Sequence, residues 1–196
     1  MTSTTAGSNI REDILDAALE LMAEHGAVGM SMRQLASRVG VQVAAIYHYF
    51  PSKDALLATV VAERQYGTRL GDPMPVDLDG TPAERLRSLF TAVWNGSLEE
   101  ESIWRVVLIE GLRGEASVLP VGQDLIELLY PAAEAWMQRF LPEIADPVSA
   151  GRLLVGQLLA GFVRRIFEPE LDPALIAEPL IDALVATLVP GPSGQQ

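Results

Sequence analysis

The chain has 196 residues, of which 49% are hydrophobic and 20% charged, which is typical of a folded globular protein and not of a disordered one. It contains no cysteine and only two histidines, which excludes disulfides and thiol nucleophiles and argues against a multi-histidine metal site. The net charge of −12 is uneven, since residues 1–70 hold six basic and seven acidic residues and the remainder eight basic and 19 acidic ones. The N-terminal part is therefore the part that can approach nucleic acid, and its near-neutral charge predicts modest non-specific affinity.

No targeting or membrane segment is expected. The first residues, MTSTTAGSN, lack the basic cluster and the apolar core of a signal peptide. The longest apolar stretch, residues 153–163, is interrupted by Gln157 and is much shorter than the roughly 20 residues that a membrane span needs. We therefore expect a cytoplasmic protein.

The first helix is expected to begin at Asn9 and to end at His25. Residues 1–8 are small and polar and are expected to be disordered. Asn9 followed by Glu12 resembles a capping box, and Gly26 stands where a helix commonly stops. The apolar residues that would form the buried stripe of this helix are Ile14, Ala18, Leu21 and Met22.

Residues 31–53, SMRQLASRVGVQVAAIYHYFPSK, predict a helix-turn-helix. The apolar residues at 32, 35, 36 and 39 have the spacing of a short amphipathic helix. Ser31 is a plausible N-cap for it, and Gly40 supplies the left-handed residue that ends it. A second short helix follows, with Val41, Ile46 and Phe50 as its buried anchors. Such a second helix can enter a DNA major groove.

The rest of the chain also predicts helices and shows no strand pattern. A linker rich in Gly, Pro and Asp is expected at residues 71–80. Pro131 is expected to kink one helix, and Pro179 to interrupt the last one. The predicted ranges are 53–70, 81–94, 97–112, 120–141, 146–167 and 172–189. The fold class is therefore all-α, with about nine helices.

The two last helices have the character of an interface. Residues 153–166 are apolar over more than one face of their helix, and an element of this kind is buried on two sides or lies at an interface. The ordinary core of a monomer is the alternative. The residues predicted for a dimer interface are Leu154, Leu158, Phe162, Ile181, Leu184 and Leu188.

The N-terminal sequence resembles a known family. Residues 9–58, with the runs ILDAALELMAEHGAVGMSMRQ and LASRVGV followed by IYHYFPSKDALL, are similar to the N-terminal domain of the tetracycline-repressor (TetR) family of bacterial transcription regulators. The resemblance implies a DNA-binding domain over residues 1–58 and an effector-binding and dimerisation domain over residues 59–196. It also implies a dimer formed through a four-helix bundle. Relatives commonly carry Ser, Lys, Gly and Thr where this chain has Gln42, Val43, Ala44 and Ala45.

Residues at the start of the second helix are expected to read bases, and flanking polar groups to hold phosphates. Gln42 carries an amide suited to adenine, whereas Val43, Ala44 and Ala45 offer only apolar contact, for example to thymine methyl groups. The resemblance implies a phosphate-contacting set, of which Tyr47 and Tyr49 could equally be packing residues. That set is Tyr47, His48, Tyr49 and Lys53, and Ser31 and Arg33 flank it from the preceding helix.

The resemblance further implies a small effector bound among the C-terminal helices. Ligand pockets are mostly apolar with a few polar groups, and this region collects all three tryptophans. Most of these aromatic residues could instead be ordinary core. The candidates are Trp94, Trp104, Arg105, Glu110, Gln123, Tyr130, Trp136, Met137, Phe140, Gln157 and Phe162.

We therefore expect a homodimeric repressor that binds a palindromic operator in double-stranded DNA and is released by a small molecule, without a cofactor. An enzyme is the second class of function. The absence of cysteine and of any Ser-His-Asp, HExxH or phosphate-loop pattern argues against it. A helical interaction or ligand-binding protein that has lost operator binding is the third class, which the apolar start of the second helix leaves open.

Overall fold

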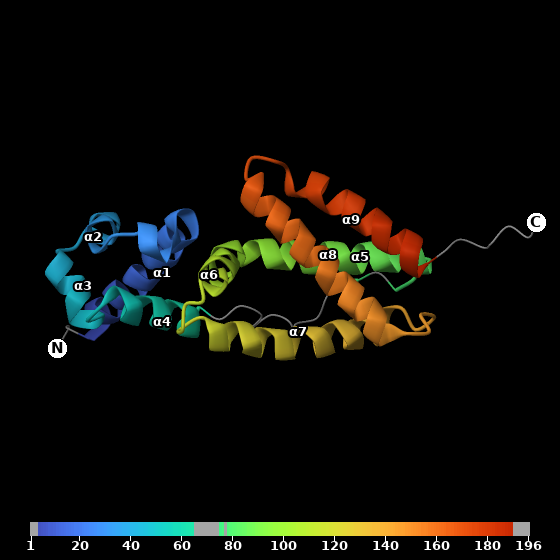
Figure 1. Ribbon diagram of the computed structural model, residues 1–196, viewed down its shortest axis with the longest axis horizontal. Coiled ribbons are helices and arrows are strands. Elements are labelled where there is room, and N and C mark those ends of the chain that lie inside the picture. The colour runs from blue at the N-terminus through green and yellow to red at the C-terminus, as the bar shows by residue number, and fades with distance from the viewer. Residues whose placement is uncertain (1–3, 65–74, 77, 190–196) are drawn as a thin grey trace, which may run out of the picture. The chain divides into compact units, whose positions relative to one another are not determined.

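The computed structural model describes residues 4–64, 75–76 and 78–189 (Figure 1). Over these residues it contains nine helices and no strand, which confirms the all-α prediction. The helices are α1 (Thr4–Gly29), α2 (Met32–Val39), α3 (Val43–Tyr49), α4 (Lys53–Glu63), α5 (Pro82–Glu99), α6 (Glu101–Leu112), α7 (Leu119–Phe140), α8 (Pro147–Phe167) and α9 (Pro173–Leu188).

The chain divides into two compact units. The described part of unit 1 is residues 4–64 and 100–125, and that of unit 2 is residues 75–76, 78–99 and 126–189. Unit 1 thus groups α6 with the four N-terminal helices. The predicted division of function between residues 58 and 59 stays a prediction.

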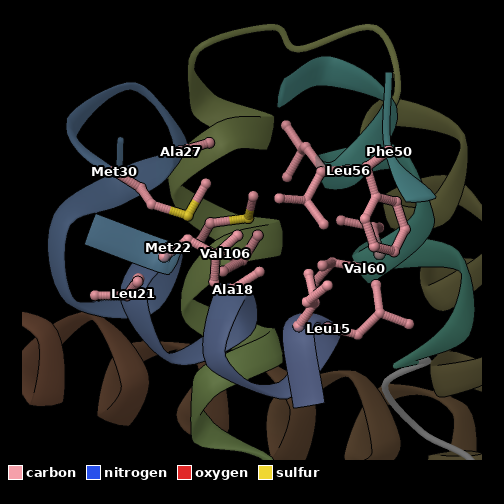
Figure 2. Close-up of a cluster of buried hydrophobic side chains, with 14 of the residues drawn as sticks. Leu15, Ala18, Leu21, Met22, Ala27, Met30, Phe50, Leu56, Val60 and Val106 are labelled. Carbon is pink, nitrogen blue, oxygen red and sulfur yellow. The ribbon is translucent and has the colours of Figure 1, made fainter. Parts of the chain in front are cut away.

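Unit 1 has one hydrophobic core, formed by α1, α2, α4 and α6 together with the anchors of α3. Leu15 and Ala18 of α1, Leu56 and Val60 of α4, and Val106 of α6 lie in one buried cluster (Figure 2). Ile46 and Phe50, the predicted anchors of α3, are buried in the same core. Its amphipathic helices therefore bury their apolar faces against one another, as the helical spacing predicted.

The first helix begins earlier and ends later than the sequence predicted. It starts at Thr4 and not at Asn9, because residues 4–8 contain no proline and a single glycine costs only about 1 kcal/mol in a helix. Residues 4–8 are thus helical where disorder was expected. Gly26 does break the helix, with φ 72° and ψ 158°, but another helical turn follows it and ends at Gly29.

Unit 2 is built from α5, α8, α9 and most of α7. Trp94 of α5 is buried between Phe90, whose ring it stacks on, and Phe162 of α8. Gly151 of α8 lies directly against α7, because a Cβ atom there would stand 2.9 Å from the backbone nitrogen of Glu134. Phe162 and Gly151 thus mark the places where α8 meets α5 and α7.

Several helices begin at a residue whose side chain caps the helix, as predicted for Ser31. The hydroxyl groups of Ser31, Ser52 and Thr81 each accept a backbone N–H three residues on, and the carboxylate of Asp146 accepts the N–H of Ser149. Asp172 caps α9 in the same way through the N–H of Ala174. The predicted end of the helix at residue 70 and most of the predicted linker lie outside the described residues.

Two interruptions do not occur at the predicted residues, and the break between the two predicted helices lies instead at Glu100. α5 continues through Asn95 and Gly96 to Glu99, and Ser97 donates its hydroxyl proton to the carbonyl of Val93 instead of capping a new helix. α9 likewise continues through Pro179. In both helices buried residues lie on either side of the helix breaker, so tertiary packing outweighs its local cost. Among the described helices none has the length and apolar character that a membrane crossing requires.

Candidate DNA-binding surface

The first helix of the helix-turn-helix is closed at both ends by local hydrogen bonds. Ser31 and Gln34 form a full capping box: the Ser31 hydroxyl accepts from the Gln34 N–H at 3.2 Å, and the Gln34 side chain accepts from the Ser31 N–H at 2.8 Å. Gly40 ends α2 with φ 78°, and its N–H reaches the carbonyl of Ala36 at 2.9 Å. The turn before α3 is thus fixed by the backbone, because only glycine adopts this φ without strain.

The second helix presents its outer face to solvent. Gln42 occupies the N-cap position of α3 but makes no capping hydrogen bond, so its exposed amide is available to another partner. Ala44, Tyr47 and His48 are also exposed, whereas Ile46 on the opposite side is fully buried. Two of the four predicted base-reading residues, Gln42 and Ala44, are therefore exposed at the start of this helix.

The remaining predicted residues divide between exposed and packed. Ser31 and Arg33 are exposed, whereas Val43, Ala45, Tyr49 and Lys53 are half-buried. Tyr49 packs against the core of unit 1, with its ring edge-on to His48 at 5.3 Å between centroids. This contact favours the packing alternative for Tyr49, while Tyr47, which is 48% exposed, remains accessible.

Most cations of the N-terminal helices are already paired. Arg38 forms ion pairs with Glu20 at 3.0 Å and with Glu24 at 3.6 Å. Arg64 pairs with Glu12 and Asp16, both at 2.8 Å. Arg11 donates to Glu63 at 2.8 Å, lies 5.7 Å from the centre of the Phe50 ring, and by its hydrogen bond lowers the pKa of the Glu63 carboxyl group. These pairs tie α1 to α2, α4 and the end of α3.

Arg33 is the exception. Between residues 10 and 64 it is the one arginine for which the described chain supplies no hydrogen bond or ion pair. Lys53 differs again, since its ammonium group donates to the carbonyl of Val28 at 2.8 Å. Sequence inspection could not distinguish these cations, because the partner of Arg11 lies 52 residues away in the chain.

The predicted effector residues fall into both units. Trp104, Arg105, Glu110 and Gln123 belong to unit 1, and the other seven belong to unit 2. In unit 2 the rings of Trp94 and Phe162 lie 5.1 Å apart, and the C-terminal part of α7 adds three buried candidates. Tyr130 and Gln123 are exposed, and Gln157 is half-buried. The three predicted effector residues that are buried in α7 are Trp136, Met137 and Phe140, and Ala133 is buried beside them.

Two of the predicted polar effector residues have partners within the protein. Glu110 accepts from the backbone N–H of Ala27 at 2.6 Å and from Arg113 at 2.9 Å. Arg105 pairs with Glu101, one turn before it on α6, at 3.0 Å. The Glu110 carboxylate in particular is buried, and its Oε1 atom accepts both of these hydrogen bonds.

The residues predicted for the dimer interface are placed differently from expectation. Five of the six fill the core of unit 2, and Leu188 is half-buried. These side chains are covered by the chain itself, and their part in a dimer stays a prediction. The same helix α8 has another apolar face that is exposed, and sequence reasoning did not separate the two faces. The five buried residues are Leu154, Leu158, Phe162, Ile181 and Leu184.

Comparisons with known proteins agree with this architecture. A family model described as "Bacterial regulatory proteins, tetR family" matches residues 14–60. The transcriptional repressor KstR of Rhodococcus jostii is 30% identical over 167 residues, which cover 83% of this chain and 77% of that protein. The nucleoid occlusion factor SlmA of an Enterobacter species is 30% identical over 164 residues, which cover 80% of each chain. Matches to several other regulators span about half of their length or less.

A crystal structure of a transcriptional regulator from Rhodococcus sp. RHA1 has the same fold, with a TM-score of 0.68 at 20% identity over 91% of this chain and 95% of that one. The likeness to KstR therefore extends past the helix-turn-helix into the helices that follow it. Relatives of this kind are transcriptional regulators, which are not enzymes. The chain belongs to the tetracycline-repressor (TetR) family of helix-turn-helix transcriptional regulators.

Proposed function

We propose that the protein is a homodimeric repressor that recognises a palindromic operator through α3 and leaves it when a small molecule binds in unit 2. The observation that carries the proposal is the accessible start of α3. There Gln42 has an unused amide, and the nearby Arg33 has no partner in the described chain. An amide of this kind can read adenine and a free guanidinium can hold a phosphate, so reading and positioning groups lie on one helix-turn-helix.

The experiment that tests the proposal is selection of binding sites from a random-sequence DNA pool by the purified protein. We expect an inverted repeat whose half-sites are centred roughly 34–36 Å apart, one helical turn of DNA. A pool that stays random after repeated rounds would contradict sequence-specific binding and would favour a protein that keeps the fold without an operator.

Gln42→Ala and Arg33→Ala are expected to weaken DNA binding in different ways. Loss of the amide should relax the preference at one base pair of each half-site, at a cost of roughly 1–3 kcal/mol, and leave binding to random DNA unchanged. Loss of the guanidinium should weaken binding to both DNAs and lower the salt slope by about one for each phosphate that is no longer neutralised. Fluorescence titrations at several salt concentrations measure both effects. Equal losses on the two DNAs for Gln42→Ala would contradict its role in base reading.

The exposed face of α8 supplies a surface for the dimer. Leu159 and Val163 are 46% and 45% exposed, and Phe167 at the end of the helix is 80% exposed. Gly156 and Ala160, one turn apart and both exposed, would let a second helix come close. We assign the dimer contact to this outer face, at helical spacing, in place of the buried residues named from the sequence. Its members are Leu153, Gly156, Leu159, Ala160, Val163 and Phe167.

The chemistry of the effector follows from Trp94. Its indole nitrogen is buried in unit 2 and has no hydrogen-bond partner among the described residues. A buried donor without an acceptor costs about 1–3 kcal/mol, so a ligand that offers an acceptor there would recover that cost. The aromatic rings of Phe90 and Phe162 beside it favour an apolar body. We therefore expect an uncharged, largely apolar effector that carries a carbonyl, ether or hydroxyl oxygen.

Trp94→Phe tests this assignment, because phenylalanine keeps an aromatic ring and removes only the donor and part of the ring area. For a compound found to release the operator, the variant should bind it about tenfold more weakly, the usual effect of removing one hydrogen bond. Leu86→Ala, which truncates another buried residue of α5 that is not an effector candidate, is the control. Isothermal titration would contradict the assignment if both variants lost affinity equally.

A further inference from the structure

The last turn of α1, together with the residue that follows it, is held in place by side chains of other helices. We call residues 26–30 the connector. It begins at Gly26, whose φ of 72° and ψ of 158° turn the chain out of the main part of α1. One helical turn follows, closed by the hydrogen bond from the Met30 N–H to the Gly26 carbonyl at 3.1 Å. Ser31, the N-cap of α2, comes directly after it, so the connector determines where the helix-turn-helix begins.

Glu110 of α6 binds the connector at its first peptide N–H. The carboxylate oxygen lies 2.6 Å from the Ala27 nitrogen and 2.9 Å from a guanidinium nitrogen of Arg113. Glu110 is only 2% exposed. Among the described residues, the buried ones with a polar or charged side chain are Ser97 and Glu110. Burying a carboxylate is unfavourable unless hydrogen bonds compensate it, so a hydrophobic core gains nothing from this residue by itself.

The fit around Gly26 shows how tightly α6 and the connector meet. A Cβ atom at this glycine would lie 2.9 Å from the Arg113 guanidinium and 3.4 Å from the Glu110 carboxylate. The side chains of Ala27 and Met30 enter the same buried cluster as Val106 of α6 (Figure 2). The connector therefore meets α6 both through hydrogen bonds and through packing.

The helix α4 holds the same segment from a second element. Lys53, the first residue of α4, donates from its ammonium group to the carbonyl of Val28 at 2.8 Å. Two backbone groups of the connector, the Ala27 N–H and the Val28 carbonyl, thus bind side chains of α6 and α4. Ser31, the N-cap of α2, directly follows the connector, and the turn at Gly40 joins α2 to α3. The position of the connector therefore determines the position of α3.

We propose that Glu110 is a positioning residue for operator recognition. It acts through the Ala27 N–H and keeps the connector, and with it α2 and α3, in the one placement that fits the operator. A displacement of α6 would move this carboxylate and so change that placement. The inference rests on the proposed DNA-binding function. It gives Glu110 a role in DNA recognition, whereas the sequence predicted a role in effector binding.

Glu110→Ala and Glu110→Gln test the proposal. The probe is the duplex that wild-type protein selects from a random pool, with a scrambled duplex of equal length for comparison. Suppose that in Glu110→Ala only about a tenth of the molecules have the helix-turn-helix in the position that fits the operator. Affinity for the selected duplex then falls about tenfold, while affinity for the scrambled duplex stays unchanged. Glutamine keeps an oxygen that can accept the Ala27 N–H and is expected to restore most of the selectivity.

Val107→Ala is the matched control for a merely structural role. Val107 is a buried residue of the same helix, and its truncation removes apolar packing from the core but leaves the hydrogen bond between Glu110 and the Ala27 N–H in place. At temperatures where both variants are folded, Glu110→Ala should lose selectivity and Val107→Ala should keep it. Hydrogen exchange supplies a second readout, because only Glu110→Ala should speed exchange of the amides at 27–40 more than those of α4.

Two results would overturn the inference. If Glu110→Ala were as selective as wild type, the connector would not need the carboxylate. If Glu110→Ala and Val107→Ala lost selectivity equally, Glu110 would contribute only to stability. Failure of the proposed function is recognised separately, because wild-type protein would then bind the selected and scrambled duplexes alike before any variant is measured.

Discussion

Replacing both Leu159 and Val163 with glutamate is expected to convert the protein from a dimer into a monomer. Each side chain is nearly half exposed on the outer face of α8, so the isolated chain tolerates a charge there. In a dimer the two faces meet around a two-fold axis, and four carboxylates would be brought into an apolar contact at once. Light scattering at micromolar concentration measures the change directly.

The same double variant is expected to lose at least about 100-fold in operator affinity. Two linked recognition helices bind their half-sites as one unit, and separating them removes the gain from effective concentration, which is about 10²–10⁴-fold. Ile126→Glu on α7 is the control, since this residue is equally apolar, is 56% exposed, and lies outside the proposed face. A double variant that remains dimeric and keeps its affinity would rule out α8 as the contact.

Gly151→Ala is expected to destabilise unit 2 by about 1–3 kcal/mol, the usual cost of overpacking. The new Cβ atom would stand 2.9 Å from the Glu134 nitrogen and 3.0 Å from the Ala133 carbonyl carbon, which are backbone atoms of α7. A flexible side chain could move aside, but a helix backbone can do so only if α7 and α8 separate. Chemical denaturation monitored by tryptophan fluorescence gives the change in the free energy of unfolding.

Gly96→Ala is the matched control for this exchange. Gly96 also lies inside a helix, and a Cβ atom there meets nothing within 4 Å. Alanine is the better helix former by about 1 kcal/mol, so this variant should be more stable than wild type. Two glycine-to-alanine exchanges thus have opposite expected signs, and stabilisation by both would show that α7 and α8 do not approach each other as closely as Gly151 indicates.

The features that could be predicted from sequence are those whose cause is local. Ser31 and Gly40 fix the ends of α2 through hydrogen bonds within four residues, and both were recognised from residue type and spacing alone. The caps at Thr81 and Asp146 belong to the same class. Local chemistry also marked Gly96 and Pro179 as breaks, and there it failed, because the burial of neighbouring side chains in unit 2 keeps those helices continuous.

The features that could not be predicted depend on partners far away in the chain. The apolar residues of α8 form two faces, and only the packed structure shows that Leu158 is core and Leu159 is surface. Glu110 looked like a polar group for a ligand because its partner is a backbone N–H 83 residues away, which carries no sequence signal. The exposure of the start of α3 could be predicted more easily, because the first residue of a recognition helix that follows a tight turn faces outward.

The internal pairing of Arg11, Arg38 and Arg64 also determines how the protein searches a chromosome. Attraction to arbitrary DNA comes from phosphate neutralisation by free cations, and these three guanidinium groups are already occupied by carboxylates of the same unit. With 19 acidic residues beyond position 70 as well, we expect non-operator DNA to hold the protein only weakly. Fewer protein molecules would then be bound to non-operator sites along the genome. The fraction of operators occupied would therefore depend closely on the number of protein molecules in the cell.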